Sequence, residues 1–436
     1  MTELKRDLGV FSCTMLVAGN MIGIGIFITA GRIYQTLPHP PAILAAWIVG
    51  GLLSLAGGLV YAELSTRFPR AGGGFVYITQ AFGPFLGFLA GFSSSLVTIP
   101  GTAAFLAIGV TKYAGIMDPV VAKTVAVASI LLISFVNDRG VLKGAWLQDS
   151  FMVLKLALIF GLIFAGFIVG HGSFSNFGVS LESTRPFLYA FPLALIPVMY
   201  TYSGWDATVY VAGEVKDPAR TLPFSLFFGC LLVMLIYLAL ACLYLYALPV
   251  NAEPFVTPEN KSRIVTVASQ ALFGVTVGNV IGAMVAVSVI GCLSATILTG
   301  PRVIFAMARS GLLPQAAGEV NPNFATPSKA IWFHGIWACL LAVTGTFDQL
   351  LDYVTVPMVF FAAINGLSLI ILRSKNASDP GAVPYKCFGY PVLPVLFILG
   401  MGWIVVNTAV QNPKDSLWGL AIVALGIPIY FILKKR

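Results

Sequence analysis

The chain has 436 residues, of which 58% are hydrophobic and only 10% are charged, and its mean hydropathy is +0.91. A water-soluble protein of this size needs far more charge to cover its surface, so the composition excludes that class. The net charge of +8 comes from basic residues dispersed over short segments, which argues against a nucleic-acid-binding patch.

Twelve apolar stretches are long enough to cross a bilayer, because a span needs about 20 predominantly apolar residues. In chain order they lie at 10–36, 41–65, 84–112, 119–137, 146–170, 187–213, 221–248, 272–300, 328–345, 350–372, 390–410 and 416–434. They lack the polar stripes at helical spacing that a soluble helical bundle shows. A cleavable signal peptide would be followed by a cleavage site of small residues, and the first stretch has none. We therefore predict an all-α polytopic membrane protein surrounded by a lipid bilayer.

Lysine and arginine fall unequally on the two sides of the predicted spans. If the N-terminus is inside, 17 of them lie in inner segments and 7 in outer ones, and Lys155 lies within a span. The outer ones are Arg32, Lys112, Lys123, Arg185, Lys261, Arg263 and Lys414. Because basic residues concentrate in cytoplasmic loops, this asymmetry predicts a cell-membrane protein with both termini in the cytoplasm.

The first span is weakened in its middle by the sequence GNMIGIGIF, which starts at Gly19. Gly19 and Gly23 alone have the spacing that lets two helices pack closely. Gly25 does not fit that interpretation, because residues two apart point away from each other on a helix. We predict a helix that ends near Ile22 and restarts near Ile26. Irregular backbone at this depth is tolerated only where protein or a water-filled cavity satisfies it.

A second break is predicted five spans later, in the stretch 187–213. Its centre reads YTYSGWD, from Tyr200 to Asp206, with the turn-like pair Ser203-Gly204 and an acid in an apolar run. With five spans per repeat, the first and sixth spans enter from opposite sides. Matched breaks in such a pair are typical of transporters built from inverted repeats, whose substrate sites lie at the breaks.

The two breaks together predict a site for the head group of an α-amino acid. Each break exposes N–H groups on one half-helix and carbonyl groups on the other, and these ends carry opposite partial charges. We expect the N–H groups around Gly25 to bind the carboxylate, and the opposed carbonyls to bind the ammonium. The predicted donors are Ile24, Gly25 and Ile26, and the predicted acceptors are Met21, Ile22, Tyr200 and Ser203. The full predicted substrate site is Met21, Ile22, Gly23, Ile24, Gly25, Tyr200, Tyr202, Ser203 and Gly204.

Four short motifs, in order along the chain, carry a family resemblance. They are GIGIF at 23–27, YSGWD at 202–206 followed by GEVKDPARTLP at 213–223, PRVIFAMAR at 301–309, and VPYK at 383–386. The first resembles the GSGIF motif of the amino acid–polyamine–organocation (APC) superfamily, and the others are similar to its L-amino acid transporter (LAT) branch. In this chain Ile24 stands where the family usually has serine or threonine, so a hydroxyl is lost and a larger side chain enters the pocket.

The resemblance implies a LeuT-type 5+5 inverted repeat with discontinuous helices 1 and 6. The corresponding division is a cytoplasmic segment 1–9, a first repeat 10–170, a second repeat 187–372 and two further helices in 390–434. The resemblance also implies a bacterial-type, sodium-independent exchanger of small or neutral L-amino acids. The sequence indicates no need for an accessory subunit.

Lys155 lies about 13 Å into the fifth span, counted at 1.5 Å per residue. A lysine at that depth is costly and points to function, although a residue nearer the helix end could snorkel to the interface. The resemblance implies that its ammonium takes the place of a sodium ion in sodium-coupled relatives. We predict that Lys155 donates to backbone carbonyls and bridges the broken first helix to a later span, the eighth. It could also carry a coupled proton.

For four other polar and aromatic residues of the spans, the sequence gives a weaker indication of function. Tyr200 resembles the aromatic gate of the family, or simply fills the bundle core. Tyr237 matches a tyrosine of the family whose hydroxyl could bridge to the broken helix through water. The alternative is that it donates to a carbonyl nearby in its own span. We expect Asp206 to cap the restarted half-helix. Glu63 is interpreted as a solvated or capping residue.

Two other function classes find little support. A membrane enzyme would need a nucleophile–base set, and a channel would need a continuous lined pore; the sequence shows neither. No residue pattern indicates a metal or a cofactor. Within transport, the alternatives are a proton-coupled amino acid symporter and an amino acid/amine antiporter.

Overall fold

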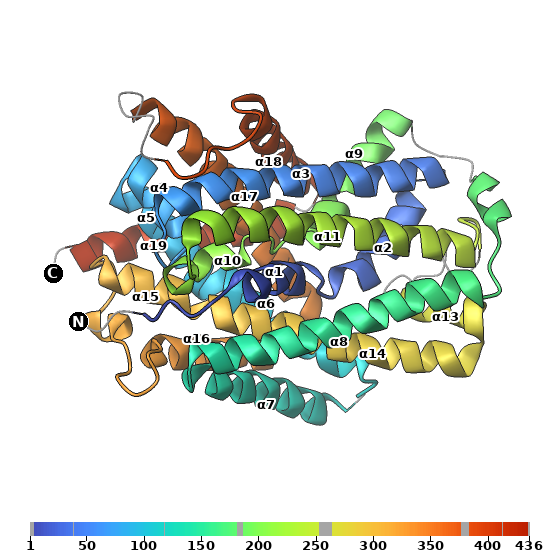
Figure 1. The fold of residues 1–436 in the computed structure, drawn as a ribbon, viewed down its shortest axis with the longest axis horizontal. Coiled ribbons are helices and arrows are strands. Elements are labelled where there is room, and N and C mark those ends of the chain that lie inside the picture. The colour runs from blue at the N-terminus through green and yellow to red at the C-terminus, as the bar shows by residue number, and fades with distance from the viewer. Residues whose placement is uncertain are drawn as a thin grey trace.

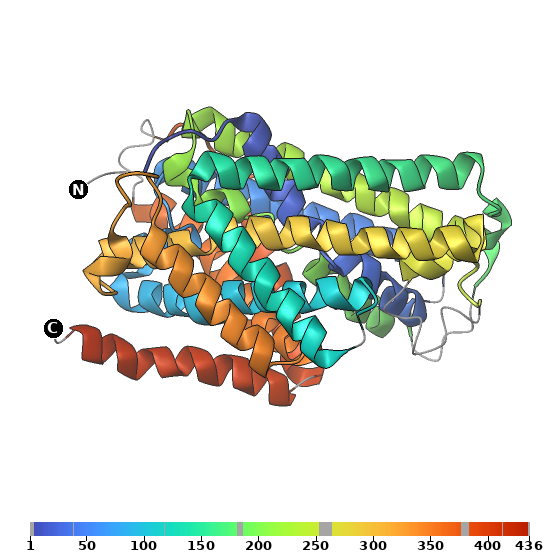
Figure 2. The ribbon, with the colours of Figure 1, turned by 90° about the horizontal axis from the view of Figure 1, so that it is seen from below.

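The computed structural model describes residues 4–434 except 38, 117, 181–185, 253–263, 376–382 and 412. Within this part the chain is almost entirely helical, as Figure 1 shows. Of the basic residues used to predict the orientation, Arg185, Lys261, Arg263, Lys435 and Arg436 lie outside the described residues, as do positions 1–3 of the predicted cytoplasmic segment. The two ends of the chain lie at the same end of the molecule (Figures 1 and 2).

The helices follow the predicted apolar stretches closely. They are α1 (Val10–Met21), α2 (Gly25–Thr36), α3 (Pro40–Arg67), α4 (Gly74–Phe82), α5 (Pro84–Ser93), α6 (Ile99–Tyr113), α7 (Pro119–Asp138), α8 (Val141–Ile168), α9 (Phe187–Thr201), α10 (Ala207–Tyr210), α11 (Pro218–Ala247), α13 (Ile264–Phe273), α14 (Val275–Thr299), α15 (Pro301–Arg309), α16 (Ser328–Thr344), α17 (Phe347–Lys375), α18 (Val392–Gln411) and α19 (Pro413–Lys434). A π-helical turn at Ser94–Thr98 joins α5 to α6. The sequence predicted neither α4 nor α13 as separate helices.

In the described part of the chain, nine helical stretches are long and apolar enough to cross a membrane. Three of the four shorter apolar helices, Phe187–Thr201, Ser328–Thr344 and Gly419–Leu433, fall in the remaining predicted spans. The prediction of an all-α polytopic membrane protein is therefore confirmed as a class. The count of twelve spans stays a prediction.

The first span is broken where the sequence predicted. Helix α1 ends at Met21 and α2 begins at Gly25, and the two are separated by three residues. The carbonyl of Met21 accepts the N–H of Gly23, which turns the chain between the two helices. Helix α1 packs against α8, α11 and α14, so the break lies inside the bundle (Figure 1).

The second predicted break is also present. Helix α9 ends at Thr201, and the short α10 begins at Ala207. Between them Gly204 has φ +96°, a left-handed conformation that glycine adopts without a steric penalty. Helix α9 packs against α2 and α3, which brings the second break next to the first.

A buried ion pair joins two segments at the end of the molecule where the chain begins. Arg302 of α15 donates from Nε to Oε1 of Glu214 at 2.7 Å and from Nη2 to Oε2 at 3.1 Å. Both side chains are fully buried. The carbonyl of Glu214 also accepts the N–H groups of Asp7 and Leu8, so the N-terminal segment is held at the same place.

Replacing Glu214 with alanine is expected to lower the free energy of unfolding by about 3–5 kcal/mol, because the buried guanidinium of Arg302 loses its counter-charge. Unfolding of the purified protein in a single detergent measures the change. Glu319→Ala is the matched control, since Glu319 forms an exposed pair with Lys329 and should lose less than about 1 kcal/mol. Equal losses in the two variants would contradict the assignment.

Glu63 is neither solvated nor a simple cap, so that interpretation was wrong. Its carboxylate is fully buried at the end of α3 and accepts from Arg67, from Arg373 of α17, and from the N–H of Cys387 before α18. The position at a helix end concealed this role, because two of its three partners lie more than 300 residues away in the chain. Glu63 therefore ties α3 to α17 and to the segment before α18.

Candidate functional site

A cavity of about 100 Å³ lies between the two broken spans. Seven of the nine predicted substrate-site residues line it: Met21, Gly23, Ile24, Gly25, Tyr200, Ser203 and Gly204. The remaining wall comes chiefly from α6, α14 and α17. The structure thus brings the two predicted half-sites together at one place inside the bundle.

The start of α2 lines this cavity at Ile24 and Gly25 and carries N–H groups without a partner in the described part of the chain. No side chain caps α2, and the N–H groups of Gly25 and Ile26 have no hydrogen-bond acceptor within the described residues. Unpaired N–H groups at a helix start carry partial positive charge and bind anions. This arrangement suits a carboxylate bound at the N-terminus of α2.

The C-terminus of α1, in contrast, already has donors from the protein. The carbonyl of Met21 accepts the hydroxyl of Tyr237 at 2.7 Å as well as the N–H of Gly23. The carbonyl of Ile22 accepts the ammonium of Lys155. In this conformation both predicted ammonium acceptors of α1 are therefore occupied by side chains.

Lys155 is fully buried on α8 and holds the end of α1. Its Nζ donates to the carbonyl of Gly19 at 3.2 Å and to that of Ile22. The prediction that it donates to backbone carbonyls of the broken helix thus agrees with the geometry. On the predicted eighth span, Lys155 lies beside Gly291 of α14. A Cβ added to that glycine would lie 3.7 Å from Nζ of Lys155. No hydrogen bond joins Lys155 to α14 among the described residues, so the expected bridge to that span is not formed here.

Tyr237 of α11 connects the two breaks directly, without the water that the sequence analysis allowed for. Its hydroxyl lies 2.7 Å from the carbonyl of Met21 and 3.2 Å from that of Thr201. These carbonyls belong to the last residues of α1 and α9. One side chain therefore positions the C-terminal ends of both interrupted helices.

Sequence reasoning missed Asn20 and Thr201. The Nδ2 of Asn20 donates to the carbonyl of Gly204 at 3.1 Å, and its Oδ1 accepts from Thr296 of α14. The hydroxyl of Thr201 contacts that of Thr29 at 2.5 Å, which links α9 to α2. Asn20 could have been found, since it is a polar residue beside the glycines of the first break.

Two residues of the predicted site do not line the cavity. Tyr202 is buried and turned toward α3, where its hydroxyl donates to the carbonyl of Trp47 at 3.0 Å. Ile22 is buried in the core, and its carbonyl accepts a hydrogen bond from Lys155. Tyr200 does line the cavity and lies 6.5 Å, between ring centroids, from Phe105 of α6.

The interpretation of Asp206 as a helix cap was wrong. Its side chain makes no capping hydrogen bond to α10, which has only four residues. Instead Oδ2 accepts the hydroxyl of Tyr210 at 2.9 Å. Asp206 also lines the central cavity and a neighbouring one of about 70 Å³. The turn that contains Gly204 therefore places an acid beside the central cavity.

Comparison with known proteins decides the family. The model of the amino acid permease family matches residues 8–433. The chain belongs to the amino acid permease family. This confirms the resemblance to the APC superfamily, a group of membrane transporters rather than enzymes.

The permease is similar over its whole length to three kinds of amino acid transporter. It is 29% identical to the serine/threonine exchanger SteT of Bacillus subtilis, over 99% of this chain and 98% of that protein. It is 27% identical to the human b(0,+)-type amino acid transporter 1, over 99% of this chain and 88% of the relative. It is 26% identical to the human large neutral amino acids transporter small subunit 2, over 98% of this chain and 80% of that protein. These relatives agree with a bacterial-type exchanger of the LAT branch.

Proposed function

We propose that this permease is a sodium-independent exchanger of small or neutral L-amino acids that works by alternating access. The observation that carries the proposal is the meeting of two interrupted helices at one cavity, with free N–H groups on one side. Such sites at the bilayer midplane are typical of transporters built from inverted repeats. The exchange activity itself is supported by the likeness to the serine/threonine exchanger of Bacillus subtilis.

The head group binds mainly through the backbone. Its carboxylate takes the N–H groups of Ile24, Gly25 and Ile26 at the start of α2. Its ammonium faces the end of α9 at the carbonyl of Ser203, because the carbonyls of Met21 and Tyr200 already accept donors from the protein. A site of this kind selects the amino acid head group and leaves the choice of side chain to the surrounding cavity walls.

The cavity favours small substrates. Its volume of about 100 Å³ is below the roughly 300–1,000 Å³ of pockets for drug-sized ligands. Ile24 adds a branched apolar side chain at the break, where the family usually has a small hydroxyl residue. Both features restrict the space beside the head group.

The proposed architecture has twelve spans in two inverted repeats. The first repeat covers 10–170, the second covers 187–372, and two further helices lie in 390–434. Both termini face the cytoplasm from the cell membrane, which agrees with the two chain ends lying at one end of the bundle (Figure 2). No accessory subunit is required.

Exchange is tested by uptake of labelled serine or alanine into proteoliposomes. Vesicles loaded with unlabelled amino acid should take up the label much faster than empty vesicles, because the carrier returns only when it is occupied. Equal rates in loaded and empty vesicles would contradict exchange. A channel would also give no stimulation from the far side.

Uptake is expected to be the same in sodium medium and in choline medium. The reason is that the ammonium of Lys155 already holds the carbonyls at the end of α1, where a coupling ion would bind. Initial rates measured in the two media, with the same loaded vesicles, provide the comparison. A clear sodium requirement would refute the role given to Lys155.

A further inference from the structure

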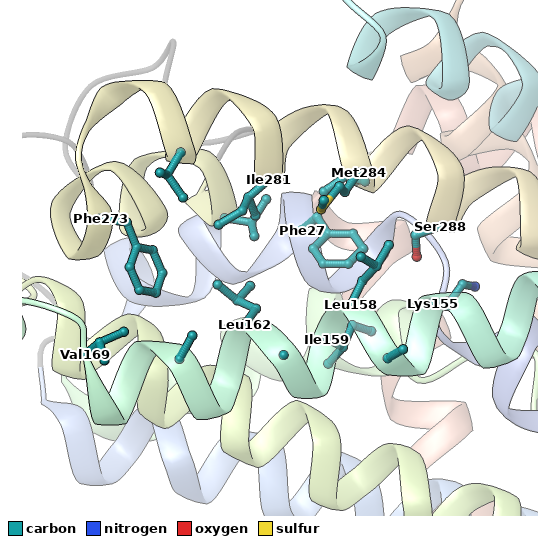
Figure 3. Close-up of a pocket in the computed structure, with 16 residues that line it drawn as sticks. Phe27, Lys155, Leu158, Ile159, Leu162, Val169, Phe273, Ile281, Met284 and Ser288 are labelled. Atoms are coloured by element: carbon teal, nitrogen blue, oxygen red, sulfur yellow. The ribbon is translucent and has the colours of Figure 1, made fainter.

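A second, larger cavity lies on the lipid side of Lys155. It has a volume of about 400 Å³ and is formed by α2, α8, α13 and α14. Figure 3 shows Leu158 and Leu162 of α8 facing Ile281 and Met284 of α14 across it. Of the sixteen lining residues, only Lys155 and Ser288 are polar, and both lie at the same end (Figure 3).

This cavity is a groove that opens sideways from the bundle. Ala157 and Gly161 on its α8 wall are exposed, and Val169 at its far end is 65% exposed. A Cβ added at Gly161 would meet no atom within 4 Å, so the glycine leaves an open gap in the wall. Because α8 is an apolar membrane span, the groove faces hydrocarbon rather than water.

The length of the groove matches one leaflet of a bilayer. From Lys155 to Val169 there are 14 residues, which is about 21 Å along a helix at 1.5 Å per residue. One leaflet contributes about 15 Å of a hydrocarbon core about 30 Å thick, and a tilted helix covers somewhat more than that. The groove therefore runs from the middle of the membrane to one interface.

We propose that this groove is a binding site for one acyl chain of a membrane phospholipid. The chain enters at the Val169 end, lies between α8 and α14, and ends beside Phe27 and the methylene groups of Lys155. Packing in the protein interior leaves few voids of this size, and an apolar groove in hydrocarbon is filled by lipid tails. The phospholipid head group stays at the interface.

The bound chain has a consequence for the first break. It covers the lipid side of Lys155, whose ammonium donates to carbonyls at the end of α1. An acyl chain keeps this side of Lys155 apolar, and a low local dielectric constant strengthens these hydrogen bonds. The chain also contacts Phe27 of α2, so it touches the second half of the broken span directly and the first half only through Lys155. The site does not depend on which amino acid is carried.

The site is tested with a phosphatidylcholine that carries a photoreactive diazirine in the inner half of one acyl chain. The full chain is placed in nanodiscs containing this lipid, illuminated and mapped by mass spectrometry. Adducts are expected to concentrate on α8 from Ala157 to Val169 and on α14 from Val277 to Ser288. Adducts spread evenly over the lipid-facing side of α8, including Val153, would overturn the proposal.

A pair of matched variants sharpens the test. Gly161→Phe fills the gap and should reduce adducts in the groove several-fold, whereas Val153→Phe changes an exposed position of α8 outside the groove and should leave them unchanged. If Gly161→Phe proves unstable in a melting assay, Ala157→Leu narrows the same wall with a smaller change. Undiminished groove adducts in a folded filling variant would refute the site, whatever the result of the transport assays.

Discussion

Gly25→Leu is expected to abolish the binding of every amino acid alike, without favouring one side chain over another. Gly25 starts α2 and lines the cavity, and its N–H group has no acceptor among the described residues. A Cβ at this position would lie 3.0 Å from Cα of Thr201 and 3.1 Å from its hydroxyl. The added side chain would therefore push α9 away from α2 and cover the N–H groups that bind the carboxylate.

Binding to the purified variant is measured by calorimetry or by ligand-induced thermal stabilisation with several amino acids. Gly25→Ala adds only the Cβ and should weaken binding of all ligands to a lesser, similar extent. Gly402→Leu is the matched control, because a Cβ on this glycine of α18 would meet nothing within 4 Å. If a folded Gly25 variant merely changed its preference among side chains, the backbone site would be wrong.

The two breaks could be predicted because their signals are local. Glycines within an apolar run weaken a helix whatever surrounds it, so the interruption between Met21 and Gly25 was placed within a residue or two. The left-handed turn at Gly204 likewise follows from glycine in a turn-like pair. The apolar stretches predicted the helices for the same reason, since their length and composition are set by the bilayer.

The partners of the broken ends were predicted only in part, through the family resemblance, because they come from distant parts of the chain. Tyr237 lies 216 residues from Met21, and Lys155 lies 133 residues from Ile22. The sequence analysis named Lys155 as a donor to carbonyls of the broken helix without saying which ones, and it assigned the carbonyls of Met21 and Ile22 to the substrate ammonium. In the structure side chains of the protein supply both donors. The carboxylate half of the predicted site is thus better supported by the geometry than the ammonium half.

The directions of side chains at the second break were the other part of the site that the sequence analysis predicted wrongly. Tyr202 belongs to the motif that carries the family resemblance, yet its ring packs against Trp47 and Tyr237 and does not line the cavity. Asp206 was expected to cap a helix. It does precede α10, but that helix has only four residues, and the carboxylate accepts from Tyr210 instead of a backbone N–H of the first turn. A turn of irregular backbone does not have the fixed periodicity from which a helix face can be read.

Lys155→Ala is expected to slow exchange strongly while changing amino acid binding little. The ammonium is the donor for the carbonyls of Gly19 and Ile22, and both are buried. Removing it leaves these acceptors at the end of α1 without that partner, at about 1–3 kcal/mol for each group. The C-terminal turn of α1 then loses its link to α8, although Gln148 and Asp149 of α8 still bond to the earlier residues Met15 and Ser12. The N–H groups at the start of α2 are unchanged. Rates are therefore expected to fall about tenfold or more, since each 1.4 kcal/mol in a barrier is a factor of ten.

Rates come from counter-flow in loaded proteoliposomes, and affinities come from the purified protein. Lys123→Ala is the matched control: Lys123 also donates to a backbone carbonyl, that of Val343 at 2.7 Å, but at an exposed site on α7. It should leave both quantities unchanged. A Lys155→Ala variant that lost binding and kept its rate at saturation would contradict the assignment.

The same lysine separates exchange from proton coupling. We expect it to act as a fixed cation that keeps its proton throughout the cycle, because two carbonyls at the end of the broken helix accept from it. Counter-flow should then be nearly indifferent to an imposed pH gradient. Empty vesicles with only an inward proton gradient should not concentrate amino acid above the external level. If they did, and if Lys155→Ala abolished that accumulation, Lys155 would carry the coupled proton and the protein would be a symporter. Because an exchanger needs substrate on both sides, the empty vesicle is the condition in which the two mechanisms give opposite results.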